Sequence, residues 1–384
     1  MPEPPEELLA LSRSLCNKMV DAISTSGPMP FDHYMRMALY EPGLGYYVNG
    51  LHKFGQAGDF VTAPEQGRIF ATAVARQIDE AAGQLGHDWT LLEIGAGSGA
   101  LARDLLEILG QPPSRYLILE PSAPLREIQA ETLAGLSDNL RTRIEWLSSP
   151  PEEPFDGVIV ANEVIDALPV KRFEMTDDGP AELAVTVAED RFDWTPVAPS
   201  PRLEQAWQSI ANTLPHPLPV GYRSEICVDL PAWFDTVTRP LKRGLALMID
   251  YGYPRAEYYL PERSDGTLVC HYRHRAHFDP FVWPGLTDLS AFVDFTAVAE
   301  TAVDCGLEVA GFTNQSGFLL SLDAHEIVEQ ADDDATRLRL AGEFKRLAMP
   351  GEMGERFKVI GLTRGFDWPL SGFEVMGQLH RLEG

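Results

Sequence analysis

Short runs of apolar residues alternate along the chain with segments whose apolar positions recur at helical spacing. The run at residues 157–161 is apolar throughout, as is typical of a strand that is buried in a parallel sheet. Strands are predicted at residues 89–94, 116–119, 144–147, 157–161 and 244–249, with the last two strands at 307–312 and 358–363. Strands that alternate with helices indicate a doubly wound α/β sheet.

The first 86 residues precede this sheet and have another pattern. Apolar positions at helical spacing predict helices over residues 6–26, 31–39 and 64–85. The long loop at residues 43–65 is rich in glycine, aromatic and carboxylate side chains, which is typical of the wall of a site. We therefore expect residues 1–86 to form a helical and loop extension that covers the site.

The connection between the strands at 157–161 and 244–249 is too long for one crossover. Within it, residues 170–196 alternate like a hairpin, and a second insertion follows the strand at 244–249. Helices are predicted at 203–214, 288–305 and 324–347. The second predicted domain is therefore residues 87–384, with insertions at about 170–225 and 251–286 that form a substrate subdomain.

The most informative motif follows the first predicted strand of the sheet. Glu93 precedes Gly95, Gly97 and Gly99, and an amphipathic helix begins at once. Glycine lets the backbone turn sharply and lets a ligand approach, and the helix start offers unpaired N–H groups to that ligand. The motif predicts a nucleotide pocket, although a glycine-rich turn without a ligand is an alternative.

Two cofactor classes fit the spacing of this loop. Its first two glycines and Ala100 satisfy the dinucleotide fingerprint, with Glu120 about twenty residues further on. However, the carboxylate of Glu93 disfavours a pyrophosphate and suits the cationic amino-acid end of S-adenosyl-L-methionine. Gly99 keeps the backbone open where the methionine part would lie. The segment resembles motif I of the Rossmann-like methyltransferases, which favours S-adenosyl-L-methionine over NAD.

Glu120 and Pro121 end the second predicted strand, at the same sheet edge as the glycine loop. Ligands of open α/β sheets lie outside the carboxyl ends of the strands. A carboxylate there can accept hydrogen bonds from both ribose hydroxyls, so we predict that Glu120 and Pro121 bind the cofactor. The alternative is a carboxylate at a helix N-terminus.

Asn162, Glu163 and Asp166 follow the fourth predicted strand. Polar side chains just past a buried strand are costly unless they face a cleft. A helix that begins here would place Glu163 and Asp166 on one side, and two carboxylates suit the paired donors of a guanidinium. We predict these three as catalytic residues; the alternative is that Asn162 caps a helix with acidic residues in its first turn.

Two further groups have a less specific pattern. Asp59, Thr62 and Glu65 lie in the long loop, where they can close over the cofactor or form a turn before a helix. The histidines at residues 271–277 belong to a segment that is interpreted as a strand, either substrate-facing or structural. No cysteine or carboxylate pair completes a metal site there, so no metal is expected.

Charge and cysteine content narrow the partners and the compartment. The 384 residues carry a net charge of −26, which repels phosphate backbones and favours a cationic partner over nucleic acid, although solubility alone also explains it. The four scattered cysteines indicate a reducing compartment, and no apolar run approaches the length of a membrane span. The acidic, proline-rich start resembles no targeting signal, so a bacterial cytoplasmic protein is expected.

Several segments together resemble the MidA / DUF185 family. They are residues 58–65, 92–99, 161–169, 250–252, 274–277 and 294–296, in the expected order over nearly the whole chain. The resemblance implies a Rossmann-like class I methyltransferase sheet, mostly parallel with an antiparallel last strand, and S-adenosyl-L-methionine as cofactor. The mitochondrial members are the complex I assembly factor 7 proteins, which are protein arginine methyltransferases. The resemblance therefore implies an arginine-bearing protein substrate, with a respiratory complex I subunit as one candidate.

Two other functions are compatible with the same residues. One is a small-molecule methyltransferase, and the other is an S-adenosyl-L-methionine-binding assembly factor with little catalysis. The intact set of Glu93, the three glycines and Glu120 argues against a vestigial pocket. The pattern is compatible with a homodimer and does not define the oligomeric state.

Overall fold

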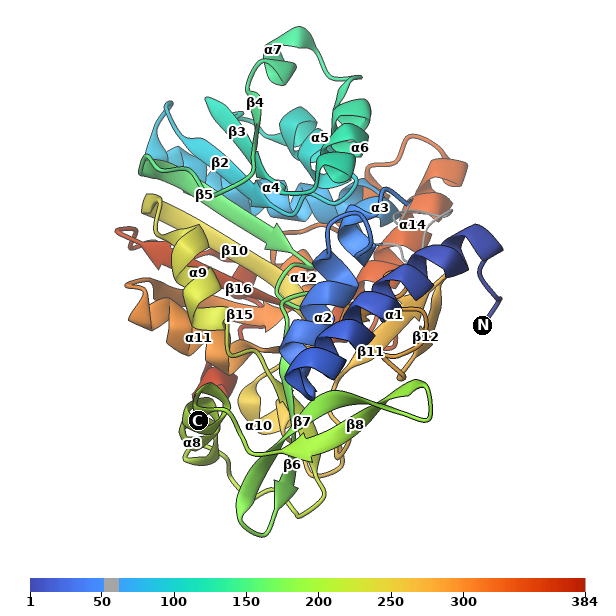
Figure 1. Cartoon of the computed structure of the whole chain (residues 1–384). Helices are drawn as coiled ribbons and strands as arrows, with labels where there is room; N and C mark the ends of the chain where they lie inside the picture. Colours follow the sequence, from blue (N-terminus) through green and yellow to red (C-terminus); the bar gives the residue numbers. More distant parts are fainter. Residues whose placement is uncertain (52–61, 384) are drawn as a thin grey trace.

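A twisted central sheet with helices on both faces forms one half of the molecule, and a second sheet lies beside its far end (Figure 1). The computed structural model describes residues 1–51 and 62–383. The central sheet has the strand order β4-β3-β2-β5-β10-β16-β15. These strands are β2 (Thr90–Ile94), β3 (Arg115–Leu119), β4 (Ile144–Leu147), β5 (Phe155–Asn162), β10 (Leu241–Tyr253), β15 (Glu308–Asn314) and β16 (Phe357–Arg364).

The strand directions confirm the predicted sheet. Strands β4, β3, β2, β5 and β10 are parallel neighbours, and β16 runs antiparallel to β10 and β15. The order reverses at β2, which lies between β3 and β5. The carboxyl ends of these strands therefore meet at a topological switch point, where ligands bind in open α/β sheets.

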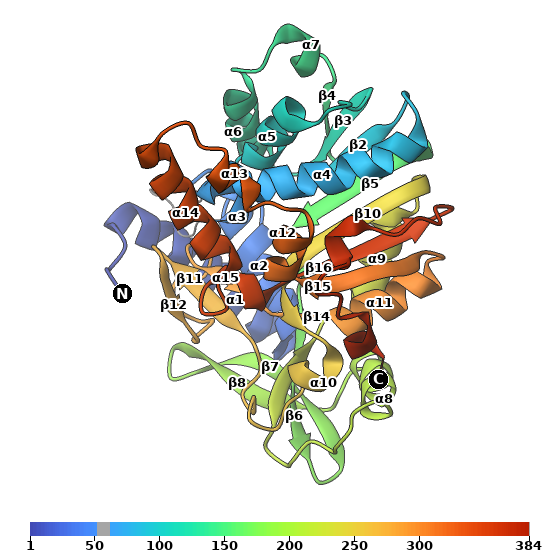
Figure 2. The same cartoon turned by 180° about the vertical axis from the view of Figure 1, so that it is seen from behind.

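Both faces of the central strands are buried, which explains the all-apolar run at residues 157–161 of β5. Alternate side chains of each strand enter two separate cores. One core is covered by α4 (Arg68–Leu85), α5 (Ala100–Ile108), α12 (Gln315–Ser321) and α14 (Asp334–Ala348), of which α4 and α14 are in front in Figure 2. The other core is covered by α9 (Leu230–Thr238) and α11 (Phe295–Asp304).

The N-terminal helices pack against the inserted strands. Apolar side chains of α1 (Glu6–Ser26) and α2 (Phe31–Tyr40) share a core with the second sheet. That sheet contains β1 (Met29–Pro30), β6 (Lys171–Thr176), β7 (Gly179–Ala188), β8 (Arg191–Val197) and β9 (Arg223–Ile226). Because β1 pairs with β7, the start of the chain is joined directly to the first insertion.

The remaining elements are short or peripheral. A third sheet contains β11 (Val269–Tyr272), β12 (Arg275–His277) and β13 (Asp288–Ser290), and β14 (Val293–Asp294) pairs with the end of β10. The helices are α3 (Ala63–Gln66), α6 (Ala123–Leu133), α7 (Asp138–Arg141), α8 (Pro201–Ala211), α10 (Arg255–Tyr258), α13 (Glu326–Glu329), α15 (Met353–Arg356), η1 (Tyr46–Val48), η2 (Ser371–Phe373) and η3 (Leu379–Leu382). Each helix in the described ranges is too short or too polar to cross a lipid bilayer.

For three helices the predicted bounds were wrong. The helix at 64–85 is broken at Gly67, whose backbone has φ 148°. The helix at 288–305 begins only at Phe295, because Asp294 caps it by accepting the N–H groups of Thr296 and Ala297. The helix at 324–347 is divided into α13 and α14, with Asp333 as the N-cap of α14. In each case a polar cap or a glycine interrupts an otherwise helical apolar pattern.

Candidate functional site

The glycine loop after β2 has a backbone that glycine adopts without strain. Gly95, Gly97 and Gly99 have φ values of 64°, 54° and 82°, all left-handed. A Cβ added to Gly95 would lie 3.1 Å from a methyl of Val164. Gly99 instead packs against Gln129 of α6 and does not line the cavity described below, so it shapes the loop from behind.

Glu93 lies at the end of β2 and is almost fully buried. Its Oε2 accepts a hydrogen bond of 2.7 Å from the hydroxyl of Tyr116. Burial raises the pKa of Glu93 to about 7, and the tyrosine hydrogen bond opposes this rise only in part. The carboxylate therefore gains from a cationic ligand, because such a ligand would offset the cost of burying the charge.

Glu120 directly follows β3, and both of its carboxylate oxygens accept a hydrogen bond. Oε1 accepts the backbone N–H of Ser122 at 2.9 Å, and Oε2 accepts Nε2 of Gln129 at 3.2 Å. Burial raises the pKa of Glu120, and these donors oppose the rise. Ser122 is the N-cap of α6, so Glu120 lies two residues before a helix N-terminus, as in the alternative, and it also lines the cavity described below. Each carboxylate oxygen retains a second lone pair for a ligand.

A sharp turn follows β5, where a helix was predicted. Glu163 has φ 54°, which a non-glycine residue rarely adopts, and the residues after it form turns. The predicted helix that would align Glu163 with Asp166, or be capped by Asn162, is therefore absent from this described segment. Left-handed backbone at such a residue costs free energy and often marks a functional site.

Burial raises the pKa of both carboxylates in this turn. Burial and the neighbouring charge of Asp166 raise the pKa of Glu163 to about 8, opposed by a hydrogen bond from Nδ2 of Asn162 at 3.1 Å. Burial raises the pKa of Asp166 to about 6, opposed by the hydroxyl of Tyr251. A third carboxylate, that of Asp250 in β10, lies beside these two. Among the described residues, no lysine or arginine forms an ion pair with Glu163, Asp166 or Asp250. This group of carboxylates therefore lacks a positive counterpart from the described chain.

One cavity of about 1490 Å³ joins most of the predicted site residues at the carboxyl ends of the strands. The predicted residues that line it are Glu93, Gly95, Gly97, Glu120, Pro121, Asn162, Glu163, Asp166 and Thr62. Thr62 is also the N-cap residue of α3. The predicted residue Asp59 lies outside the described residues. The cavity exceeds the roughly 300–1000 Å³ that is usual for small-molecule pockets, which leaves room for an acceptor beside a cofactor.

Sequence reasoning missed the aromatic side chains that complete the cavity wall. Tyr40 donates to the carbonyl oxygen of Ala167 at 2.9 Å, and the Tyr47 hydroxyl donates to Asp288 at 3.0 Å. Tyr251, Tyr253, Phe292 and Phe357 also line the cavity. The loop at residues 43–65, which contains Tyr47, is predicted to be the wall of a site, but no pattern identified Tyr47 itself or the other aromatic residues as part of that wall.

The segment around the histidines forms a hairpin rather than one strand. Arg273 and His274, with φ 47° and 59°, make the two-residue turn between β11 and β12. His271 lines the cavity. In the described part of the chain, no three histidine, cysteine or carboxylate side chains are grouped so that they could hold a metal ion.

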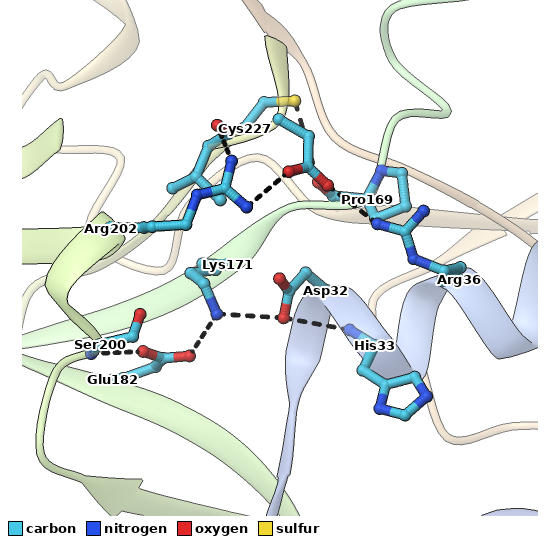
Figure 3. A network of polar contacts seen from close by, with 11 residues as sticks. Asp32, His33, Arg36, Pro169, Lys171, Glu182, Ser200, Arg202 and Cys227 are labelled. Carbon is cyan, nitrogen blue, oxygen red and sulfur yellow. Dashed lines mark hydrogen bonds and ion pairs between the residues drawn. The ribbon is translucent and has the colours of Figure 1, made fainter. Parts of the chain in front are cut away.

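A network of ion pairs lies beside the segment that leads from the turn after β5 into β6 (Figure 3). Nζ of Lys171 lies 2.8 Å from Glu182 and 3.2 Å from Asp32 of α2. Nearby, Asp229 pairs with Arg36 of α2 and with Arg202 of α8, each at 2.8 Å. Because β6 begins just after the turn, this network ties the turn to the N-terminal extension.

Comparisons with known proteins agree with this geometry. A family model described as an S-adenosyl-L-methionine-dependent methyltransferase matches residues 72–313. The chain is 29% identical to the mitochondrial protein arginine methyltransferase NDUFAF7 of Danio rerio, over 91% of this chain and 86% of that protein. It is 28% identical to the Drosophila melanogaster homolog, over 97% and 92% of the two chains.

A solved structure is also similar over the full length. A Burkholderia thailandensis protein bound to S-adenosyl-homocysteine superposes with a TM-score of 0.93 and is 38% identical, covering 99% of both chains. A native structure from the same organism has a TM-score of 0.90 at 38% identity, again covering 99% of both chains.

Proposed function

Because the chain belongs to this family of S-adenosyl-L-methionine-dependent methyltransferases, we propose that it methylates an arginine side chain of a protein. The observation that carries the proposal is the group of Glu163, Asp166 and Asp250, which has no cationic partner among the described residues. A buried cluster of carboxylates favours a cationic acceptor, and a planar guanidinium can donate to two of them at once. The relatives named above are protein arginine methyltransferases.

The cavity residues fit the cofactor on one side. We propose that Glu93 receives its amino group, that the loop at Gly95 and Gly97 lies along it, and that Glu120 with Pro121 receives its ribose. The left-handed glycines keep this wall free of side chains, and the raised pKa of Glu93 to about 7 favours a cationic ligand. When bound, S-adenosyl-L-methionine supplies an activated sulfonium methyl group.

The acceptor side lies at the turn after β5. We assign to Glu163 the orientation of the guanidinium nitrogen and the acceptance of the proton that this nitrogen loses when its bond to the methyl carbon forms. A carboxylate whose pKa is raised to about 8 is a better proton acceptor than an ordinary glutamate. Holding the two reacting groups together can lower the barrier by several kcal/mol, roughly 7–11 in well-oriented systems.

The extension at residues 1–86 and the insertions at about 170–225 and 251–286 would then form the acceptor side of the cavity. Tyr40, Tyr47 and His271, which come from these segments, all line it. In the described residues all four cysteines are free, which is compatible with the proposed location in the bacterial cytoplasm.

The test is transfer of a labelled methyl group, with methylarginine identified by mass spectrometry after hydrolysis. Replacing Glu163 by Gln should reduce transfer by about 10²-fold or more, as expected for loss of a general base. Binding of S-adenosyl-homocysteine, measured by calorimetry, should change little, because Glu93 and Glu120 are retained. Label found only on small molecules, or full activity of the variant, would contradict the proposal.

A further inference from the structure

The carboxylate of Asp250 holds the backbone of the turn that follows β5. Its Oδ2 accepts the N–H groups of Val164, Ile165 and Asp166 at 3.2, 2.9 and 3.2 Å. Its Oδ1 accepts the N–H of Tyr251 at 2.9 Å. Three successive amides directed at one oxygen form an anion-binding concavity, which this side chain of β10 fills. The backbone of the turn is therefore fixed, and its side chains are oriented by contacts of their own.

Tyr251, the next residue of β10, makes such a contact with Asp166. Its hydroxyl donates to Oδ2 of Asp166, whereas Oδ1 is buried and has no hydrogen-bond partner. The tyrosine ring is held edge-on by Phe292 and Phe357, with centroids 5.0 and 5.5 Å away. A ring that is packed on two sides presents its hydroxyl from a defined position. One oxygen of Asp166 is thus occupied, and the other is a buried polar atom without a hydrogen-bond partner, in a residue that lines the cavity.

We propose that Tyr251 is the positioning residue of the acceptor site: its hydroxyl holds Oδ2 of Asp166 so that Oδ1 receives the guanidinium. The assignment of Oδ1 to a cationic acceptor rests on the proposed function. The contact between the hydroxyl and the carboxylate does not, so the two can be tested separately.

The surroundings of Asp166 make this contact electrostatically important. Burial raises the pKa of Asp166, and the Tyr251 hydroxyl is the largest influence that lowers it. The other titratable groups that face this cluster are Glu163, Asp250, Tyr40 of α2, Tyr47 of η1 and Asp288 of β13. All of them are acids or neutral phenols. Loss of the hydroxyl should therefore raise the pKa of Asp166 further, because only the hydrogen bonds with Ser290 and with the backbone of Asp166 and Ala167 would still oppose the rise.

The substitution Tyr251→Phe tests the contact, and Tyr253→Phe is its matched control. Phenylalanine keeps the ring between Phe292 and Phe357 and removes only the hydroxyl. Tyr253 lies two residues further on the same face of β10 and stacks on the same Phe292 at 5.6 Å, but forms no hydrogen bond with Asp166.

The direct readout is the pKa of Asp166, measured by carbon-13 NMR titration of aspartate carboxyl carbons in the presence of S-adenosyl-homocysteine. An Asp166→Asn variant assigns the signal. The pKa should rise by about one unit in Tyr251→Phe, a tenfold change in the ionisation constant, and stay unchanged in Tyr253→Phe. An unchanged pKa in Tyr251→Phe, or an equal rise in both variants, would overturn the proposal.

A double-mutant cycle then shows whether Tyr251 acts through Asp166. With an acetylated Gly-Arg-Gly amide as probe, Tyr251→Phe should lower kcat about tenfold, without weakening S-adenosyl-L-methionine binding. Combined with Asp166→Asn, it should cause no further loss, because the two residues act as a unit. Additive losses would contradict positioning through Asp166.

The two proposals fail differently. A wild-type protein that binds the cofactor but leaves every arginine substrate unmethylated would contradict the proposed function. The NMR titration, which needs no acceptor, would still decide whether Tyr251 sets the ionisation of Asp166.

Discussion

Individual carboxylates at this site are buried at a cost that a ligand can offset. Glu93 lies at the end of β2, whereas Glu163 and Asp166 lie in the turn after β5. Burial is the main cause of the raised pKa of each. In an ordinary core such groups would be paired with cations or replaced by apolar residues. Their retention at one cavity is best explained by a cationic ligand on each side of the reaction.

The raised pKa of Glu163 makes the stability of the ligand-free protein depend on pH. Its folded-state pKa, about 8, lies above that of an exposed glutamate. The group therefore contributes stability at low pH, and this contribution is lost as the pH rises through about 8. We expect the thermal unfolding temperature to fall between about pH 5.5 and about pH 8.5, and to fall less in Glu163→Gln, whose side chain stays neutral. Equal falls in calorimetric scans of both proteins would contradict this.

Gly95 provides a test of the cofactor wall. An alanine there would have to keep φ 64° and would approach Val164, so Gly95→Ala should lose about 1–2 kcal/mol of stability and about tenfold in S-adenosyl-homocysteine affinity. Gly83→Ala is the control, because Gly83 lies in α4 with nothing near its added Cβ. It should gain about 0.5–1 kcal/mol and bind normally. Urea unfolding and calorimetry measure the two effects.

At the scale of elements, the site depends on strands and helices that are distant in sequence. The turn after β5 is held by β10 through Asp250 and by α2 through the hydrogen bond from Tyr40 to Ala167. Lys171 at the start of β6 completes this support with its contacts to Asp32 and Glu182. The proposed acceptor side is thus assembled from an N-terminal helix, an inserted sheet and a core strand.

Replacing Lys171 tests how much this support contributes. Lys171 and Glu182 are both nearly fully buried, so Lys171→Ala leaves a buried carboxylate without its partner and should cost about 3–5 kcal/mol. Arg141→Ala removes an exposed pair with Asp138 and should cost about 0–1 kcal/mol. Chemical unfolding compares the two variants; similar losses would show that the buried network adds little.

At the scale of the whole molecule, the net charge of −26 favours the approach of a cationic segment. Long-range attraction of this kind raises association rates and is screened by salt. We expect kcat/KM for an arginine-bearing protein substrate to fall several-fold between about 50 mM and about 500 mM salt, as the screening length shortens. The affinity for S-adenosyl-homocysteine should change less, because that ligand binds inside the cavity. A salt-independent kcat/KM in initial-rate measurements would argue against steering.

Much of this architecture could be predicted from local sequence. The central strands were predicted from the apolar pattern, the antiparallel last strand from the resemblance to the methyltransferases, and the cofactor class from the glycine loop together with that resemblance; all three are confirmed. The errors occurred where a single residue overrides periodicity, as Gly67 and Asp294 do at the helices they end or begin. The expected helix at Glu163 was wrong for a different reason, because the amides of that turn are bound by Asp250, more than eighty residues away.

The sequence by itself determined the sheet and the glycine loop, because apolar periodicity and glycine conformations are local properties of the chain. The kind of cofactor followed from Glu93 and Gly99 together with the resemblance to the methyltransferases. Only the tertiary structure decided which side chains surround the proposed acceptor site. Tyr251 contacts Asp166 and Phe357, and Tyr40 contacts Ala167, the residue after Asp166. These contacts exist only once β10, β16 and the N-terminal extension have packed together. The hydrogen bond from the Tyr251 hydroxyl to Asp166 could not be predicted from spacing or composition, because the two residues are 85 positions apart in the sequence.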